Sequence, residues 1–269
     1  MKVLFLDAYN LIYRARAGFA MGDYPIVYNF FRQLRPLIEK FNPDSVYFVL
    51  EGNPKFRKEL SSGAYKSNRT SAGDSFHRQK AAIINIVSEL FPFNTARHPD
   101  LECDDTIATL AIDYAKKGND VSIISSDSDF IQLLNIKNAN IELYNPVRKK
   151  FIEPPDYDYV TWKALRGDNT DNISGIPGIG DKTADKLMRN PEKLKILLEN
   201  KEKLQIFEKN VNLIRLVDFS NNMSELELKK GSGDFEMVYG AFEDLGFESF
   251  LKEKTWNKFV QTFGRLNCI

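Results

Sequence analysis

The chain has 269 residues, of which 43% are apolar and 12% aromatic, so it can bury one large core or two coupled lobes. Its 37 basic residues balance its 37 acidic residues, and any surface that attracts a polyanion must therefore be local. Two cysteines and two histidines disfavour a disulfide framework and a zinc site, and they fit a reducing compartment. The first apolar run is too short for a signal peptide, and no long apolar stretch follows. We expect a soluble, cytoplasmic protein without a membrane partner.

Strand and helix patterns alternate along the first part of the chain. Four apolar runs predict buried strands: 3–6, 46–50, 121–124 and 141–144. Three segments with apolar residues at helical spacing predict amphipathic helices: 27–41, 83–91 and 107–115. We expect Pro36 to kink the first helix and Gly118 to end the third. Strands alternating with helices are typical of an α/β fold with a parallel sheet flanked by helices.

Pro154 and Pro155 mark the expected domain boundary. Beyond them the pattern is almost wholly helical, with a capped start at Asn190 and Pro191. We therefore expect an α/β core over residues 1–155 and a helical lobe over 156–269.

Carboxylates follow the predicted strands at the points where the strands end. Seven acidic residues lie at these ends or at one helix start: Asp7, Glu51, Glu102, Asp104, Asp105, Asp127 and Asp129. Because ligand sites in open parallel sheets lie beyond the carboxyl ends of the strands, these side chains can converge on one crevice. For any one of them alone, a place in a turn or in the first turn of a helix is the favoured interpretation, and only the whole set points to a site.

Clustered carboxylates need cations, because like charges raise one another's pKa. Ligand sets made only of oxygen suit Mg²⁺ or Mn²⁺, and two such ions can activate a water and stabilise the leaving oxygen of a phosphodiester. Asp168 and Asp171 are compatible with a polar turn, but beside the other acids they would complete a second metal site.

The glycine-rich segment from Gly175 to Thr183 lacks the spacing of a phosphate-binding Walker loop, because Asp181 stands where the lysine should be. The segment instead predicts a turn between two helices, whose backbone amides can bind a DNA phosphate. Lys182 and Lys186 add positive charge at helical spacing, and a side chain at Gly180 is expected to obstruct the turn. A plain helical hairpin with solvated lysines is the alternative.

The sequence resembles the 5′-nuclease family, which includes flap endonucleases, the 5′-nuclease domain of bacterial DNA polymerase I and phage 5′-exonucleases. Five separated segments carry the resemblance: Leu6–Arg14, Phe56–Arg69, Leu101–Asp105, Ile124–Asp129 and Leu165–Thr183. Two positions depart from the family pattern. Glu51 stands where the family usually has Asp, and Cys103 replaces a small residue, which we interpret as a buried apolar filler.

The resemblance implies roles for individual residues. It assigns one metal ion to Asp7, Glu102, Asp104 and Asp105, with Glu51 nearby, and a second ion to Asp127, Asp129, Asp168 and Asp171. Residues around the scissile phosphate would be Arg14, Tyr65, Lys66 and Arg69. Contacts to duplex DNA would come from Lys163, Gly175, Gly178, Gly180, Lys182, Thr183 and Lys186.

The implied architecture is a PIN-like nuclease core, a DNA-binding lobe with a helix-three-turn-helix that can also hold K⁺, and a helical arch over about 56–92. Basic residues of the arch, Arg57 among them, are expected to face DNA. The implied activity is that of a monomeric, structure-specific 5′-nuclease, a flap endonuclease and 5′-3′ exonuclease in DNA replication or repair. Its partner would be DNA with 5′ flaps, ends or junctions. A PIN-like ribonuclease and a DNA-binding protein that has lost catalysis are the rival interpretations.

Overall fold

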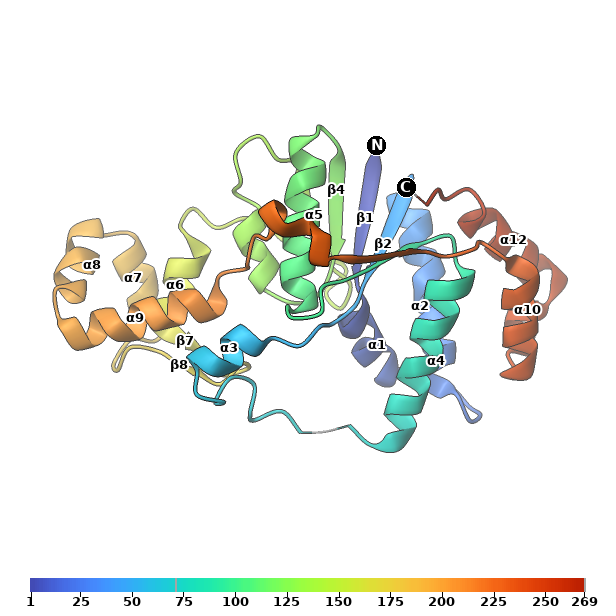
Figure 1. Ribbon diagram of the computed structural model, residues 1–269, viewed down its shortest axis with the longest axis horizontal. Helices are drawn as coiled ribbons and strands as arrows, with labels where there is room; N and C mark the ends of the chain where they lie inside the picture. The colour runs from blue at the N-terminus through green and yellow to red at the C-terminus, as the bar shows by residue number, and fades with distance from the viewer. Residues whose placement is uncertain (71, 269) are drawn as a thin grey trace.

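The computed structural model describes residues 1–70 and 72–268 (Figure 1). Within these residues a seven-stranded sheet has the order β6-β5-β4-β1-β2-β3-β9. Five strands run parallel: β1 (Lys2–Asp7), β2 (Ser45–Val49), β3 (Asn94–Arg97), β4 (Asp120–Ile124) and β5 (Ile141–Asn145). The edge strands β6 (Lys150–Phe151) and β9 (Glu227–Lys230) are antiparallel to their neighbours. The parallel α/β fold predicted from the sequence is confirmed.

Successive side chains of a strand point to opposite faces of the sheet, and helices cover both faces of its central strands. In β1, Leu4 and Leu6 pack with the helices α1 (Ala8–Arg16), α2 (Pro25–Phe41) and α4 (Asp74–Leu90). Val3 and Phe5 pack on the other face with α5 (Cys103–Lys116) and the short helix η1 (Asp129–Leu133). This double burial explains why the strands read as continuous apolar runs.

All four predicted strands and three predicted helices are present. Gly118 follows α5 with a φ of +82°, as expected of a residue that ends a helix. α2 contains Pro36 and continues to Phe41. β3 and β9 were not predicted, because neither segment contains an apolar run.

A helical lobe lies at one end of the molecule (Figure 1). It contains α6 (Tyr159–Arg166), the two-stranded β7 (Gly167–Asp168) and β8 (Ile173–Ser174), α7 (Asp181–Met188), α8 (Pro191–Leu198) and α9 (Lys201–Ile214). Leu165, Ile176 and Ala184 form its small core. The helix α3 (Lys55–Leu60) contacts α9, so the segment expected to form the arch begins against the lobe. Between α3 and α4 the described residues form turns.

The last part of the chain returns to the core. After the short helix η2 (Ser220–Glu225), β9 pairs with β3. The helices α10 (Phe235–Asp244), α11 (Glu248–Leu251) and α12 (Glu253–Phe263) then lie beside α2 and α4, at the end of the molecule opposite to the lobe (Figure 1). Phe242 packs against Phe31, and Phe263 packs against Phe91. The expected lobe of residues 156–269 therefore contains two separate groups of helices. Among the described helices, none combines the length and apolar character needed to cross a membrane.

Candidate active site

The carboxyl ends of the central strands bring the first group of acids together. Asp7 ends β1, Glu51 follows β2, and Asp127 follows β4, while Asp104 lies in the first turn of α5. Ligand atoms of Asp7, Cys103 and Asp104 all lie within 4.8 Å of one another. Asp7 and Asp104 therefore lie close together beyond the carboxyl ends of the strands.

Asp7 is fixed in place by two hydrogen bonds. Its carboxylate accepts from the backbone N–H of Asn10 at 3.0 Å, which caps α1, and from the hydroxyl of Ser125 at 2.7 Å. Burial raises the pKa of Asp7 to about 6. Burial, followed by the charges of Asp127 and Asp7, also raises the pKa of Asp104 well above its ordinary value. A cation would relieve this crowding of negative charge.

Glu51 also reaches this group, although it is longer than the Asp usual in the family. Its Oε2 accepts a hydrogen bond from the backbone N–H of Cys103 at 3.1 Å. Burial, followed by the charge of Glu102, raises the pKa of Glu51. Cys103 is buried, and its thiol lies 3.7 Å from Asp7 Oδ1. The thiol therefore borders the carboxylates and also packs in the core, as expected of a filler.

A second group of acids lies between the core and the lobe. Carboxylate oxygens of Asp129 in η1, Asp168 in β7 and Asp171 all lie within 4.8 Å of one another. Asp127 precedes this group, and its Oδ1 accepts the backbone N–H of Asp129 at 2.9 Å. Oxygen donors gathered in this way fit a divalent cation.

Three residues from the segment after α3 link the two groups of acids. The hydroxyl of Tyr65 donates to Glu102 at 2.8 Å and to Asp171 at 3.2 Å. Lys66 forms an ion pair with Glu102, and Arg69 donates to Asp171 at 2.7 Å. The pKa of Lys66 is raised, because the neighbouring Glu102 and Asp171 outweigh the opposing effect of burial. The site thus places positive charge between two clusters of carboxylates.

Comparison with known proteins identifies the family. Residues 2–161 match the model of the 5′-3′ exonuclease N-terminal resolvase-like domain, and residues 154–229 match that of the 5′-3′ exonuclease C-terminal SAM fold. The chain belongs to the 5′-3′ exonuclease family. It is 31% identical to the 5′-3′ exonuclease of Aquifex aeolicus over 94% of this chain and 95% of that protein.

Some other relatives of this chain are longer. The chain is 30% identical to the thermostable DNA polymerase I of Thermus filiformis, of which it spans 33%. Among solved structures, the T5 D15 protein crystallised with metal ions has the same fold, with a TM-score of 0.66 over 98% of both chains and 18% identity. The PIN-like architecture expected from the sequence agrees with this match.

Lys163 does not lie where the resemblance placed it. Its side chain is 2% exposed and forms ion pairs with Asp129 and Asp168, the latter at 2.6 Å. The expected contact with duplex DNA is therefore wrong, because the ammonium points into the second group of acids. A lysine on a helix gives no signal of burial in a single sequence.

Asp105 and Arg57 are likewise engaged with each other. Arg57 donates to the two carboxylate oxygens of Asp105 at 2.5 and 2.7 Å, and both side chains are buried. Asp105 also accepts the backbone N–H of Val217 at 2.8 Å. Asp105 therefore lacks a free face for a metal ion, and Arg57 does not face DNA. The pairing was missed because Asp105 was interpreted as a metal ligand beside the other acids, and Arg57 as a surface residue that faces DNA.

Arg14 lies beside the first group of acids without touching it. Its guanidinium donates to Gln33 at 2.8 Å and lines a hollow of about 610 Å³ together with Asn10 and Ser126. Asn10 and Ser126 are hydrogen-bonded to each other at 2.8 Å. Both fall within segments that carried the resemblance, three residues after Asp7 and one before Asp127, but their spacing alone gave no functional signal.

The glycine loop contains two kinds of glycine. A Cβ on Gly175 would lie 2.2 Å from the carbonyl oxygen of Arg166, so this position is packed. Gly178 and Gly180 are exposed, and a Cβ on either would meet no atom within 4 Å. The expectation that a side chain at Gly180 obstructs the turn is wrong, because Gly180 has an extended backbone at the start of α7.

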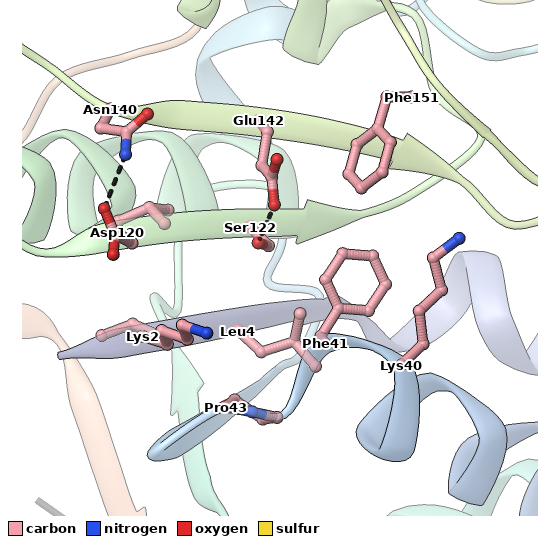
Figure 2. A pocket seen from close by; sticks show the side chains of 12 residues that line it. Lys2, Leu4, Lys40, Phe41, Pro43, Asp120, Ser122, Asn140, Glu142 and Phe151 are labelled. Atoms are coloured by element: carbon pink, nitrogen blue, oxygen red, sulfur yellow. Dashed lines mark hydrogen bonds between the residues drawn. The ribbon is translucent and has the colours of Figure 1, made fainter.

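A hollow of about 470 Å³ at the amino ends of the strands contains none of the expected site residues among its described lining (Figure 2). Asp120 and Glu142 accept hydrogen bonds from Asn140 and Ser122 there, at 2.6 and 2.7 Å. Each of these two acids thus has a neutral polar partner.

Proposed function

We propose that the chain is a structure-specific 5′-nuclease that hydrolyses DNA phosphodiesters near 5′ ends, flaps or junctions. The observation that carries the proposal is the pair of carboxylate clusters linked by Tyr65, Lys66 and Arg69 at the carboxyl edge of a parallel sheet. Support comes from the T5 D15 flap endonuclease, whose solved complex contains DNA and metal ions.

Two divalent ions, Mg²⁺ or Mn²⁺, fit the two clusters. Asp7, Asp104 and Glu51 would hold the first, with Glu102 at its side. Asp129, Asp168 and Asp171 would hold the second, with Asp127 between the two. When bound, such ions supply a nucleophilic water and stabilise the leaving oxygen of the phosphodiester.

The side chains around the clusters orient the substrate. Lys66 and Arg69 are positively charged and would stabilise the negative charge that develops on the phosphate in the transition state. Tyr65 holds Glu102 and Asp171 at a fixed separation through its hydroxyl. Arg14 can receive a neighbouring phosphate in the hollow beside Asn10.

The lobe would grip the duplex away from the cut. Gly178 and Gly180 leave the backbone at the start of α7 open to close approach by a phosphate. Lys182, Thr183 and Lys186 are exposed along the following helix. Backbone carbonyls of this loop could also hold K⁺. Both the duplex contact and the K⁺ site would thus lie within α6–α9 of a single molecule, which would act as a monomer.

Metal exchange tests the proposal. With Mg²⁺ the protein should cut a 5′-flap duplex. Ca²⁺, which is larger and less demanding of octahedral geometry, should support binding without efficient cutting. EDTA should abolish cutting. Binding without cutting in Mg²⁺ would favour the DNA-binding protein that has lost catalysis, and selective cutting of an RNA strand would favour the ribonuclease.

A further inference from the structure

A buried ammonium lies inside the second carboxylate cluster. Lys163 extends from α6 between Asp129 and Asp168, and it forms ion pairs with both. The cluster therefore already contains one cation supplied by the protein, in the place where the proposed function puts a divalent ion.

The ammonium remains charged in this position. The Lys163 side chain is 2% exposed, and carboxylate oxygens of Asp129 and Asp168 lie within ion-pair distance of it, the latter at 2.6 Å. Taking an ammonium and a carboxylate out of water is costly unless each is compensated, and here each compensates the other.

Lys163, Asp129 and Asp168 come from different parts of the fold. Asp129 belongs to η1, which packs in the core, whereas Asp168 and Lys163 belong to the lobe. Lys163 thus ties the lobe to the core through the acids of the proposed metal site. An uncharged, well-packed residue would have served a purely structural role on α6 equally well.

We propose that Lys163 is an internal cation of the second metal site, which holds Asp129 and Asp168 together in the absence of the divalent ion and competes with that ion for their oxygens. The inference rests on the proposed function, because it presupposes a divalent ion at this cluster. Removing Lys163 takes one positive charge away from Asp129 and Asp168 and so leaves their oxygens more attractive to an incoming divalent ion. Lys163 therefore weakens divalent binding at this site.

The variant Lys163→Met tests this competition, because it keeps the apolar stem and removes the charge. Calorimetric titration with Mg²⁺ and Mn²⁺, without DNA, should show one site with at least about tenfold tighter binding than in the wild type. In EDTA the variant should melt at a lower temperature than the wild type, and Mg²⁺ should raise its Tm by more. Unchanged affinity together with an equal rise in Tm would overturn the inference.

Two further variants serve as controls. Lys163→Arg keeps the charge and should keep wild-type affinity. Lys195→Met removes an exposed lysine on α8 and should change neither affinity nor Tm response. Tighter binding in Lys195→Met as well would assign the effect to net charge and overturn the inference.

If Lys163→Met does not fold, the wild type alone decides the question by NMR. The Nζ resonance of Lys163, assigned with Lys163→Arg, should shift when Mg²⁺ is added. A resonance that stays unchanged while Mg²⁺ binds would overturn the inference and leave the proposed function intact. A wild type that binds no divalent ion would contradict the proposed function itself.

Discussion

Asp7 illustrates how burial disfavours negative charge on a single residue of this site in the absence of metal. Burial raises its pKa from 3.8 to about 6, so the folded protein binds a proton that the unfolded chain has already released between these pH values. The contribution of Asp7 to stability is therefore most favourable below about pH 4. It declines by on the order of 3 kcal/mol as the pH rises to about 6 and above.

Chemical denaturation in EDTA across this pH range measures the effect. Asp7→Asn should lose most of the decline, because the amide does not titrate, and should be more stable than the wild type near neutral pH. Mg²⁺ should reduce the difference for the wild type. An identical pH dependence in both proteins would show that Asp7 is not the group responsible.

Lys66 is the residue for which we predict the largest direct effect on rate. Its ammonium lies between Glu102 and Asp171, at the side where phosphate would approach the acids. Lys66→Met should lower the single-turnover rate by roughly a hundredfold, in the range found for loss of one preorganised charge contact. Lys195→Met is the control. Recovery of the full rate at high enzyme concentration would instead assign Lys66 to DNA docking.

Among the helices, Arg57 connects α3, α5 and the end of α9 through hydrogen bonds. From α3 it pairs with Asp105 in α5, and it donates to the carbonyl oxygens of Leu213 and Arg215 at the end of α9. Arg57→Met leaves a buried carboxylate unpaired, so we predict a loss of about 3–5 kcal/mol in unfolding free energy.

The double variant Arg57→Met/Asp105→Leu provides the comparison, measured by urea denaturation. It should recover much of the lost stability, because it removes the orphaned charge as well. A single variant with wild-type stability would show that the ion pair contributes nothing to folding.

The glycine loop allows a matched test of structure against binding. Gly175→Ala should lower the Tm, because its Cβ would overlap the backbone of Arg166. Gly180→Ala should leave the Tm unchanged but weaken duplex binding, since only an approaching phosphate would meet the added methyl group. Lys182→Ala should flatten the log–log salt dependence of binding by about one unit. Unchanged duplex affinity in both Gly180→Ala and Lys182→Ala would reduce the loop to a structural hairpin.

How far sequence predicts these elements depends on where their side chains point. Val3–Leu6 is buried on both faces, so its apolar run predicted both the strand and the position of Asp7 at its end. The exposed strand β9 carries no such signal, and its pairing with β3 is decided by tertiary contacts. Arg57 and Lys163 were placed facing DNA because a basic residue reads as a surface residue until its buried partners are known.

For the whole molecule, the second group of acids lies between the core and the lobe, and the C-terminal helices lie at the end opposite to the lobe (Figure 1). A duplex held by α7 would therefore approach the acids from the lobe side. The helices α10–α12 extend the aromatic core around Phe242 and Phe259 and lie away from the proposed DNA-binding surface. We thus propose that the helical lobe binds the duplex and that the acidic groups carry out the cleavage.

The most direct test of this account is single-turnover cleavage of a 5′-flap duplex, labelled at either end of the flap strand, by the wild type and Asp127→Asn. Asp127 lies between the two acidic groups and is half-buried, so replacing its carboxylate by the amide of Asn should leave the fold intact. We predict Mg²⁺-dependent cleavage near the junction by the wild type, and a rate at least about a hundredfold lower for Asp127→Asn at unchanged Tm. Full activity of Asp127→Asn, or wild-type cleavage in EDTA, would contradict the account.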